Sequence, residues 1–101
     1  MDKMRLTNLY DIYGKLLTKN QSKMFELYYM DDLSLREIAA NEYVTFQAVR
    51  SALKTAENRL EKFEKTIHMY ETKEDLKKLN NLLEKENLKN SEITEILNKI
   101  M

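Results

Sequence analysis

The sequence predicts an all-α fold built around a helix-turn-helix, and three observations support this. The 101 residues include one glycine, Gly14, and no proline, so the composition contains almost nothing that interrupts helices. Apolar residues recur at steps of three and four along most of the chain. Hydroxyl residues stand three positions before Glu or Gln at two points, a pattern typical of helix N-termini. The length fits one domain, or one domain with an appendage.

The first helix is expected over residues 4–17. Its apolar residues form one stripe, which consists of Leu6, Leu9, Tyr10, Tyr13, Leu16 and Leu17. Gly14 lies inside this helix, where glycine costs about 1 kcal/mol relative to alanine. Close packing against a neighbour is one reason for a glycine at this position, and chance is another.

Two shorter helices are expected over residues 19–29 and 35–41. Each begins with a capping box, in which a hydroxyl side chain and a Glu or Gln side chain bond each other's backbone N–H groups. The two pairs are Thr18 with Gln21 and Ser34 with Glu37. The acidic pair Asp31–Asp32 is expected to form the turn between the two helices.

A long fourth helix is expected over residues 46–70, with Thr45 as its N-cap. At 1.5 Å per residue it would span about 38 Å, roughly twice what a recognition helix needs. Its apolar residues alternate four- and three-residue steps over three heptads, which is typical of a coiled-coil seam. We therefore expect a homodimer whose seam consists of Ala56, Leu60, Phe63, Ile67 and Tyr70.

The character of the sequence changes near residue 71, where lysine and glutamate become frequent. We expect a helix-turn-helix domain over residues 1–71, including the extended fourth helix, and a helical tail or dimerisation extension over 72–101. A fifth helix is expected to begin after a Thr72 cap, and a last short helix at Ser91.

Residues 35–54 meet the packing requirements of a helix-turn-helix. Ala39 is small enough for two helices to cross closely, and apolar side chains hold the second helix on the first. The turn "EYVT" has Tyr43 where glycine is frequent, which predicts an unfavourable backbone conformation there. "LSLREIAANEYVTFQAVRSALKTAENRL" resembles region 4 of the sigma-70 family. This resemblance implies a winged-helix-like core of three or four helices.

A wider segment resembles the YlxM family of small bacterial helix-turn-helix proteins. "LLTKNQSKMFELYYMDDLSLREIA" and "QAVRSALKTAENRLEKFEKTIHMYE" carry this resemblance, from about residue 9 to residue 71. YlxM genes lie beside those of the signal recognition particle protein or its receptor. The resemblance therefore implies a regulatory or accessory protein of that targeting pathway, without catalytic activity, whose partner is the particle's protein or its RNA.

The exposed side of the fourth helix is the candidate binding face. Its residues, with Arg36 from the preceding helix and the cap residue, are Arg36, Thr45, Phe46, Gln47, Arg50, Ser51, Lys54 and Asn58. Gln47 suits adenine, Arg50 suits guanine, and lysine suits phosphate, so a sequence-specific DNA-binding regulator is the alternative function. Phe46 departs from the polar or basic residue common in the YlxM family. It fits either a protein or RNA contact, or packing against the first helix as core.

Charge argues against strong DNA binding. The chain has 17 basic and 17 acidic residues, and residues 34–65 carry six basic and five acidic side chains. A protein that neutralises several phosphates draws most of its affinity from basic side chains. The sequence leaves open whether DNA, RNA or protein binds this face, or whether it is an ordinary solvated helix face of mixed charge.

Several classes of protein are excluded or disfavoured. The absence of cysteine excludes disulfides and thiolate metal sites. His68, near Glu64 and Glu71, is better interpreted as a surface residue than as a metal ligand, so we expect no metal, no cofactor and no enzyme. No segment approaches the roughly 20 apolar residues of a membrane span, and we expect a cytoplasmic protein.

Overall fold

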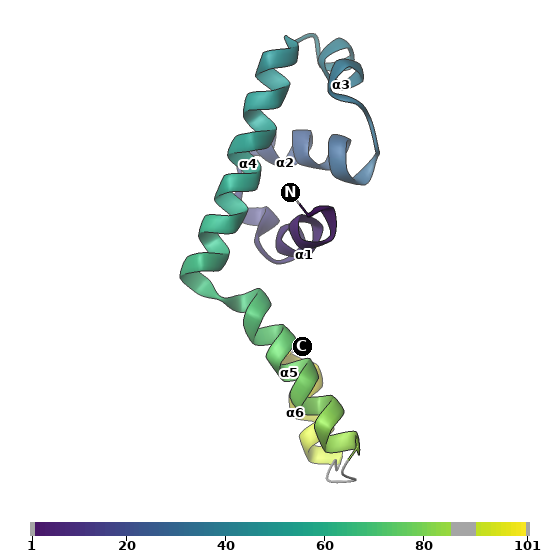
Figure 1. The fold of residues 1–101 in the computed structure, drawn as a ribbon, viewed down its shortest axis with the longest axis vertical. Helices are drawn as coiled ribbons and strands as arrows, with labels where there is room; N and C mark the ends of the chain where they lie inside the picture. The colour runs from purple at the N-terminus through teal and green to yellow at the C-terminus, as the bar shows by residue number, and fades with distance from the viewer. Residues whose placement is uncertain (1, 86–90, 101) are drawn as a thin grey trace. The chain divides into compact units, whose positions relative to one another are not determined.

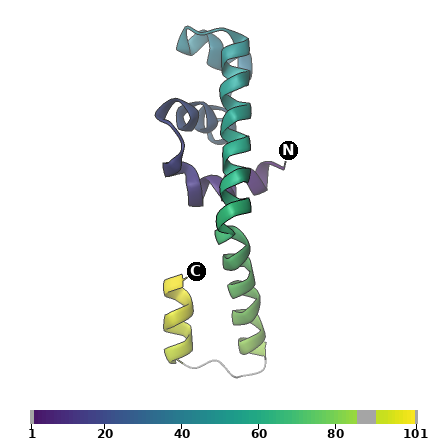
Figure 2. The same cartoon turned by 90° about the vertical axis from the view of Figure 1, so that its left-hand side faces the viewer.

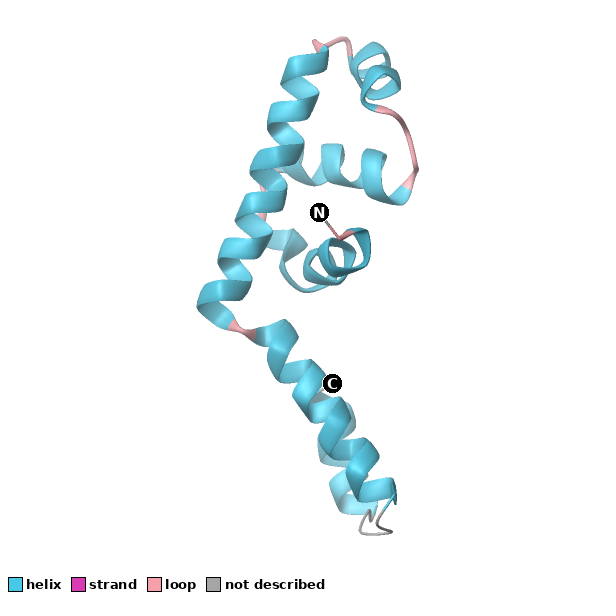
Figure 3. Ribbon diagram, in the orientation of Figure 1, coloured by secondary structure: helices cyan, strands magenta, loops and turns pink. Residues whose placement is uncertain are grey.

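The computed structural model describes residues 2–85 and 91–100, and all regular structure in these ranges is helical (Figures 1 and 3). The all-α prediction is therefore confirmed. The chain divides into two compact units, Met1–Ile67 and His68–Met101, which are described separately. The predicted division into domains after residue 71 stays a prediction.

The first unit begins with α1, Lys3–Tyr13, which continues as a 3-10 turn, η1, over Gly14–Leu16. The predicted helix over 4–17 is thus shorter and ends in a tighter turn. The side chain of Asp2 caps α1, because its Oδ1 accepts a 3.0 Å hydrogen bond from the N–H of Met4. A Cβ at Gly14 would lie 2.9 Å from Cε1 of Tyr10, so close packing explains this glycine.

The next elements are α2, Lys19–Phe25, a π-helical turn, η2, over Glu26–Met30, and α3, Leu35–Glu42. Both predicted capping boxes are confirmed. The Thr18 hydroxyl accepts from Gln21 N at 3.1 Å, and Gln21 Oε1 accepts from Thr18 N at 3.0 Å. Ser34 and Glu37 form the same pair of bonds, each 3.1 Å long. These bonds set where α2 and α3 begin.

The core of the first unit forms along α4, Phe46–Ile67, which packs against α1, α2 and α3 (Figure 1). Thr45 caps α4 as predicted, since its hydroxyl oxygen accepts a 3.0 Å bond from the N–H of Ala48. The buried apolar side chains of this unit are Leu6, Leu9, Tyr13, Leu17, Met24, Phe25, Ile38, Val49, Leu53, Ala56 and Leu60.

The prediction of one helix over 46–70 is wrong, because α4 ends at Ile67. His68 adopts a left-handed backbone conformation with φ of 58°, which cannot continue a right-handed helix. The next helix, α5, runs over Met69–Lys85, so the predicted Thr72 cap is also wrong. Thr72 instead lies in its first turn, where its N–H and hydroxyl donate to His68 O at 2.9 and 2.8 Å.

The second unit consists of α5 and α6, Ser91–Ile100, which lie side by side and run in opposite directions (Figure 2). Leu97 of α6 is buried, whereas Leu82 and Ile96 are 59% and 53% exposed. The predicted start of a helix at Ser91 is confirmed, and most of the predicted break before it lies outside the described residues. Among the described helices, none combines the length and the apolar character needed to cross a membrane.

Candidate nucleic-acid interface

The helix-turn-helix consists of α3, a turn over residues 43–45 and α4. Its core contains the buried side chains of Met24, Ile38, Val49 and Leu53. Tyr43 ends α3 in the left-handed conformation, with φ of 56° and ψ of 40°. The predicted unfavourable backbone at Tyr43 is therefore confirmed. The turn closes with a 3.1 Å hydrogen bond from the N–H of Val44 to the carbonyl of Ala39.

The residues predicted to bind a partner all lie at the surface. Those on α4 that are exposed to solvent are Phe46, Gln47, Arg50, Ser51, Lys54 and Asn58, and Arg36 of α3 is exposed as well. Phe46 is 38% exposed, and the guanidinium carbon of Arg36 lies 5.8 Å from its ring centroid. The alternative in which Phe46 is a core residue is therefore wrong. Thr45 serves as the cap of α4 rather than projecting with the others.

The acidic side chains in the C-terminal half of α4 are all bonded to the N-terminal helices. Glu61 accepts two hydrogen bonds from the Arg5 guanidinium, at 2.8 and 2.9 Å. Glu64, only 6% exposed, accepts a 2.7 Å bond from the Tyr13 hydroxyl. Glu57 accepts a hydrogen bond from the Tyr29 hydroxyl.

The spacing of these three glutamates places them on one flank of α4, next to its buried side. They follow each other at steps of four and three, so they share a helix face. Because that flank is directed toward α1 and η2, the carboxylates lie away from the outer side of α4. The near balance of charge over residues 34–65 therefore does not describe the exposed face.

The outer side of α4 carries a stripe that contains no acidic residue. This α4 stripe consists of Gln47, Ser51, Lys54, Asn58, Lys62 and Lys65, at steps of three and four, and all six are exposed. Within the described ranges, no ion pair joins its lysines to a carboxylate. The stripe spans about 27 Å at 1.5 Å per residue. Sequence reasoning found its first four residues and missed Lys62 and Lys65.

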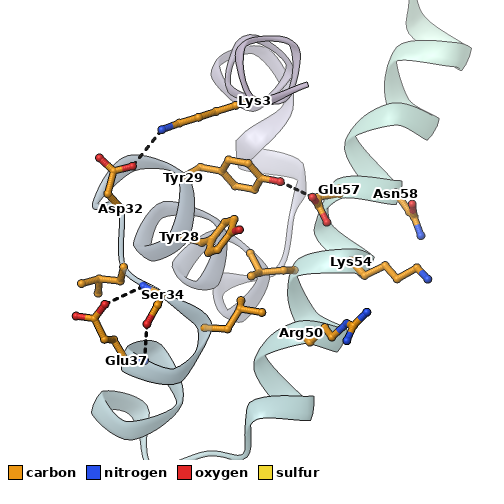
Figure 4. Close-up of a pocket in the computed structure, with 13 residues that line it drawn as sticks. Lys3, Tyr28, Tyr29, Asp32, Ser34, Glu37, Arg50, Lys54, Glu57 and Asn58 are labelled. Carbon is orange, nitrogen blue, oxygen red and sulfur yellow. Dashed lines mark hydrogen bonds and ion pairs between the residues drawn. The ribbon is translucent and has the colours of Figure 1, made fainter. Parts of the chain in front are cut away.

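A pocket of about 790 Å³ lies beside the stripe, between α4, η2 and the start of α3 (Figure 4). Tyr28 and Tyr29 point toward α4, whereas Arg50, Lys54 and Asn58 extend from α4 on the opposite side from the tyrosines. Burial, and then the bond to Glu57, raise the pKa of Tyr29. The phenol therefore stays protonated and holds Glu57 in place.

The predicted dimer seam is divided by the structure. Ala56 and Leu60 are fully buried in the core of the first unit, whereas Ile67 is 47% exposed. Phe63 is half-buried, with its ring centroid 6.0 Å from that of Tyr13. Tyr70 belongs to α5 and not to α4. The first two residues are thus covered by the chain's own helices, and homodimer formation stays a prediction.

His68 lies at the surface of the second unit. Its Nδ1 is 3.3 Å from Oε2 of Glu71, and the two side chains are 58% and 68% exposed. An exposed pair of this kind contributes little to stability, because solvent screens it.

The fold defines this chain as a helix-turn-helix protein with an exposed polar and basic second helix, and comparison with known sequences gives the family. The profile of the UPF0122 family, described as "helix-turn-helix protein, YlxM / p13 like", matches residues 1–100. The chain belongs to this family. The sequence-based resemblance to YlxM proteins is therefore confirmed.

Individual relatives have the same family name. A UPF0122 protein of Limosilactobacillus reuteri is 47% identical over 66 residues, which is 65% of this chain and 58% of that protein. One from Geobacillus sp. (strain WCH70) is 42% identical over 80 residues, covering 79% of this chain and 73% of the relative. One from Caldanaerobacter subterraneus is 40% identical over 77 residues, 76% of this chain and 66% of the relative. The chain thus spans less than two thirds of the Limosilactobacillus protein.

Proposed function

We propose that this chain is a non-enzymatic accessory protein of the signal recognition particle pathway, acting in the cytoplasm, and that the α4 stripe binds the RNA of the particle. The observation that carries the proposal is the acid-free outer side of α4. Its lysines can neutralise phosphates, since the neighbouring carboxylates are bonded to α1 and η2.

The composition of the α4 stripe favours RNA as the ligand. Gln47, Ser51 and Asn58 are neutral donors and acceptors that share one helix face with three lysines. RNA helices are bound mainly through phosphates and 2′-hydroxyl groups across a wide, shallow minor groove. A helix face of polar and basic side chains suits such a surface. The pathway itself is taken from the YlxM family, whose genes lie beside those of the particle's protein or receptor.

A DNA-binding regulator is the second candidate. It is favoured by the placement of Gln47 and Arg50 in the first turns of α4, where a helix-turn-helix reads base edges. Base reading of this kind gives a strong preference for one duplex sequence, whereas the lysines of the α4 stripe offer phosphate contacts that do not depend on sequence.

The test is parallel binding of the purified protein to the particle's RNA, the particle's protein and mixed-sequence duplex DNA, each at two salt concentrations. We expect binding to the RNA that weakens as salt rises. The charge reversal Lys62→Glu with Lys65→Glu should abolish most of this binding. The matched control is Lys15→Glu with Lys19→Glu, which changes net charge equally at exposed positions outside the stripe.

Three outcomes would contradict the proposal. Equal losses in the two double variants would mean that only net charge matters. Tighter binding to duplex DNA than to the RNA would favour the regulator. Binding to the particle's protein alone would assign the face to a protein contact.

A further inference from the structure

The turn of the helix-turn-helix presents an aromatic ring in an unusual backbone conformation. Tyr43 is 95% exposed, so its ring packs on almost nothing in the first unit. Its φ of 56° lies in the left-handed region, where a bulky side chain is disfavoured and Gly or Asn is preferred. Folding alone therefore gives no reason for a tyrosine here, because neither its packing nor its backbone stabilises the turn.

Further apolar and aromatic surface lies beside Tyr43. Val44 is 41% exposed and Phe46 is 38% exposed, and the Arg36 guanidinium lies over the Phe46 ring. Tyr43 and Phe46, three positions apart in the chain, thus place two aromatic rings at the N-terminal end of α4. Single exposed apolar residues are ordinary, but a cluster that includes arginine marks a contact surface.

Two exposed arginines lie beside this cluster, because Arg36 lies over the Phe46 ring and Arg50 follows Phe46 by one helical turn. Glu42, the adjacent carboxylate, is paired with Lys23 at 2.8 Å. Arg36 and Arg50 are exposed, and neither forms an ion pair within the described part of the chain. The α4 stripe continues from this end of the helix. The aromatic rings are therefore joined to a basic surface, which is complementary to a phosphate backbone.

We propose that Tyr43 and Phe46 form a stacking platform for unpaired bases of an RNA stem–loop, with Arg36 and Arg50 on the flanking phosphates. The proposal rests on the proposed function, in which the α4 stripe holds the paired stem. Unpaired bases in loops are recognised by stacking on aromatic rings and arginine planes, whereas paired bases do not expose their faces. The structure thus assigns the two ends of α4 to different parts of one RNA.

The experiment measures binding of the full chain to three probes with one stem sequence. They are an RNA stem closed by a loop of unpaired adenines, the same stem as a blunt RNA duplex, and the DNA equivalent of the stem–loop. A fourth sample carries 2-aminopurine in the RNA loop, whose fluorescence falls when it stacks on a ring.

The variants are Tyr43→Asn, which suits the left-handed backbone but removes the ring, and Tyr43→Phe, which keeps the ring. Tyr43→Asn should weaken stem–loop binding about tenfold, the loss typical of one stacked base. It should leave duplex binding unchanged and remove the fluorescence loss. Tyr43→Phe should behave as the wild type. Because Asn suits this conformation better, Tyr43→Asn should unfold at the same temperature or higher.

Four results would overturn the platform. One is unchanged stem–loop binding by Tyr43→Asn. If the double variant Lys62→Glu with Lys65→Glu still loses RNA binding, this result would reject the platform and leave the proposed function standing. A second is equal weakening for stem–loop and duplex. A third is tighter wild-type binding to the DNA stem–loop than to the RNA stem–loop, which would assign the site to DNA. The last is absence of RNA binding by the wild type, which would reject the proposed function as well.

Discussion

The hydroxyl of Tyr13 donates a 2.7 Å hydrogen bond to Oε1 of Glu64, and both residues are buried although 51 positions separate them in the sequence. This bond joins the end of α1 to the last turns of α4. It belongs to a set of contacts, with Arg5–Glu61 and Tyr29–Glu57, that ties the acidic flank of α4 to the rest of the first unit. Fold stability and the charge of the exposed face of α4 therefore depend on the same side chains.

Replacing Tyr13 with Phe should destabilise the first unit by about 1–3 kcal/mol, because the buried carboxylate of Glu64 loses a hydrogen-bond donor. Urea unfolding of the purified variant measures this change. Tyr43→Phe is the matched control, since it removes a hydroxyl from a side chain that is 95% exposed. Similar stabilities for the two variants would show that the Tyr13–Glu64 bond contributes nothing.

Leu60→Ala should lower the free energy of unfolding by about 2–5 kcal/mol, the usual cost of a cavity in a packed core. Leu60 has no exposed surface, whereas Leu16, 52% exposed, provides a control of the same chemistry in the same unit. Leu16→Ala should change stability by no more than about 0.5 kcal/mol. If Leu60→Ala instead kept its stability and only lowered the molecular mass in sedimentation, Leu60 would belong to a dimer seam.

Stability should decline at alkaline pH through Tyr29. Burial and the bond to Glu57 raise the pKa of its phenol above the ordinary 10.0, so the folded state holds this proton more tightly than the unfolded state. The contribution is complete below pH 10.0 and is lost as pH rises through the raised pKa. Unfolding in urea at about pH 9 and pH 11 should show a smaller decrease for Tyr29→Phe than for the wild type. Parallel decreases would argue against a role for this phenol.

The start of α3 should loosen at acid pH. Hydrogen bonds from the backbone and the side chain of Ser34 lower the pKa of Glu37 below its ordinary 4.5. The stabilisation is therefore complete above pH 4.5 and is lost as pH falls through the lowered pKa. Glu37→Gln keeps a capping side chain that does not titrate. Amide hydrogen exchange in the first turn of α3 should accelerate in acid for the wild type beyond the Glu37→Gln variant, and identical acid profiles would contradict this.

Local signals in the sequence were sufficient for the helices of the first unit. The caps at Thr18, Ser34 and Thr45 each form hydrogen bonds between residues three positions apart. These bonds therefore depend on the local sequence alone. The break at His68 was missed because no glycine, proline or capping box marks it. The residue with the left-handed backbone is a histidine. The three- and four-residue spacing of apolar side chains continues on both sides of it, so the sequence pattern shows no break.

The candidate site was predicted in part. Exposure of Gln47, Arg50, Ser51, Lys54 and Asn58 follows from the periodicity of α4, because a residue opposite the apolar stripe faces solvent. Lys62 and Lys65 were missed because they flank the apolar seam of α4 together with Glu64, and that pattern pointed to self-association. The direction in which each α4 carboxylate points depends on its hydrogen-bond partner. These partners, Arg5, Tyr13 and Tyr29, are distant in sequence, so a local pattern does not reveal them.

The sequence by itself therefore determined the helical class, the helix-turn-helix and its family, since apolar period, capping and turn chemistry are local properties. Only the tertiary structure decided which face of α4 carries charge and where α4 ends. The physical reason is that hydrogen bonds between α4 and the N-terminal helices join residues tens of positions apart. They direct the acidic flank toward the interior of the unit and leave the lysines on the solvent side.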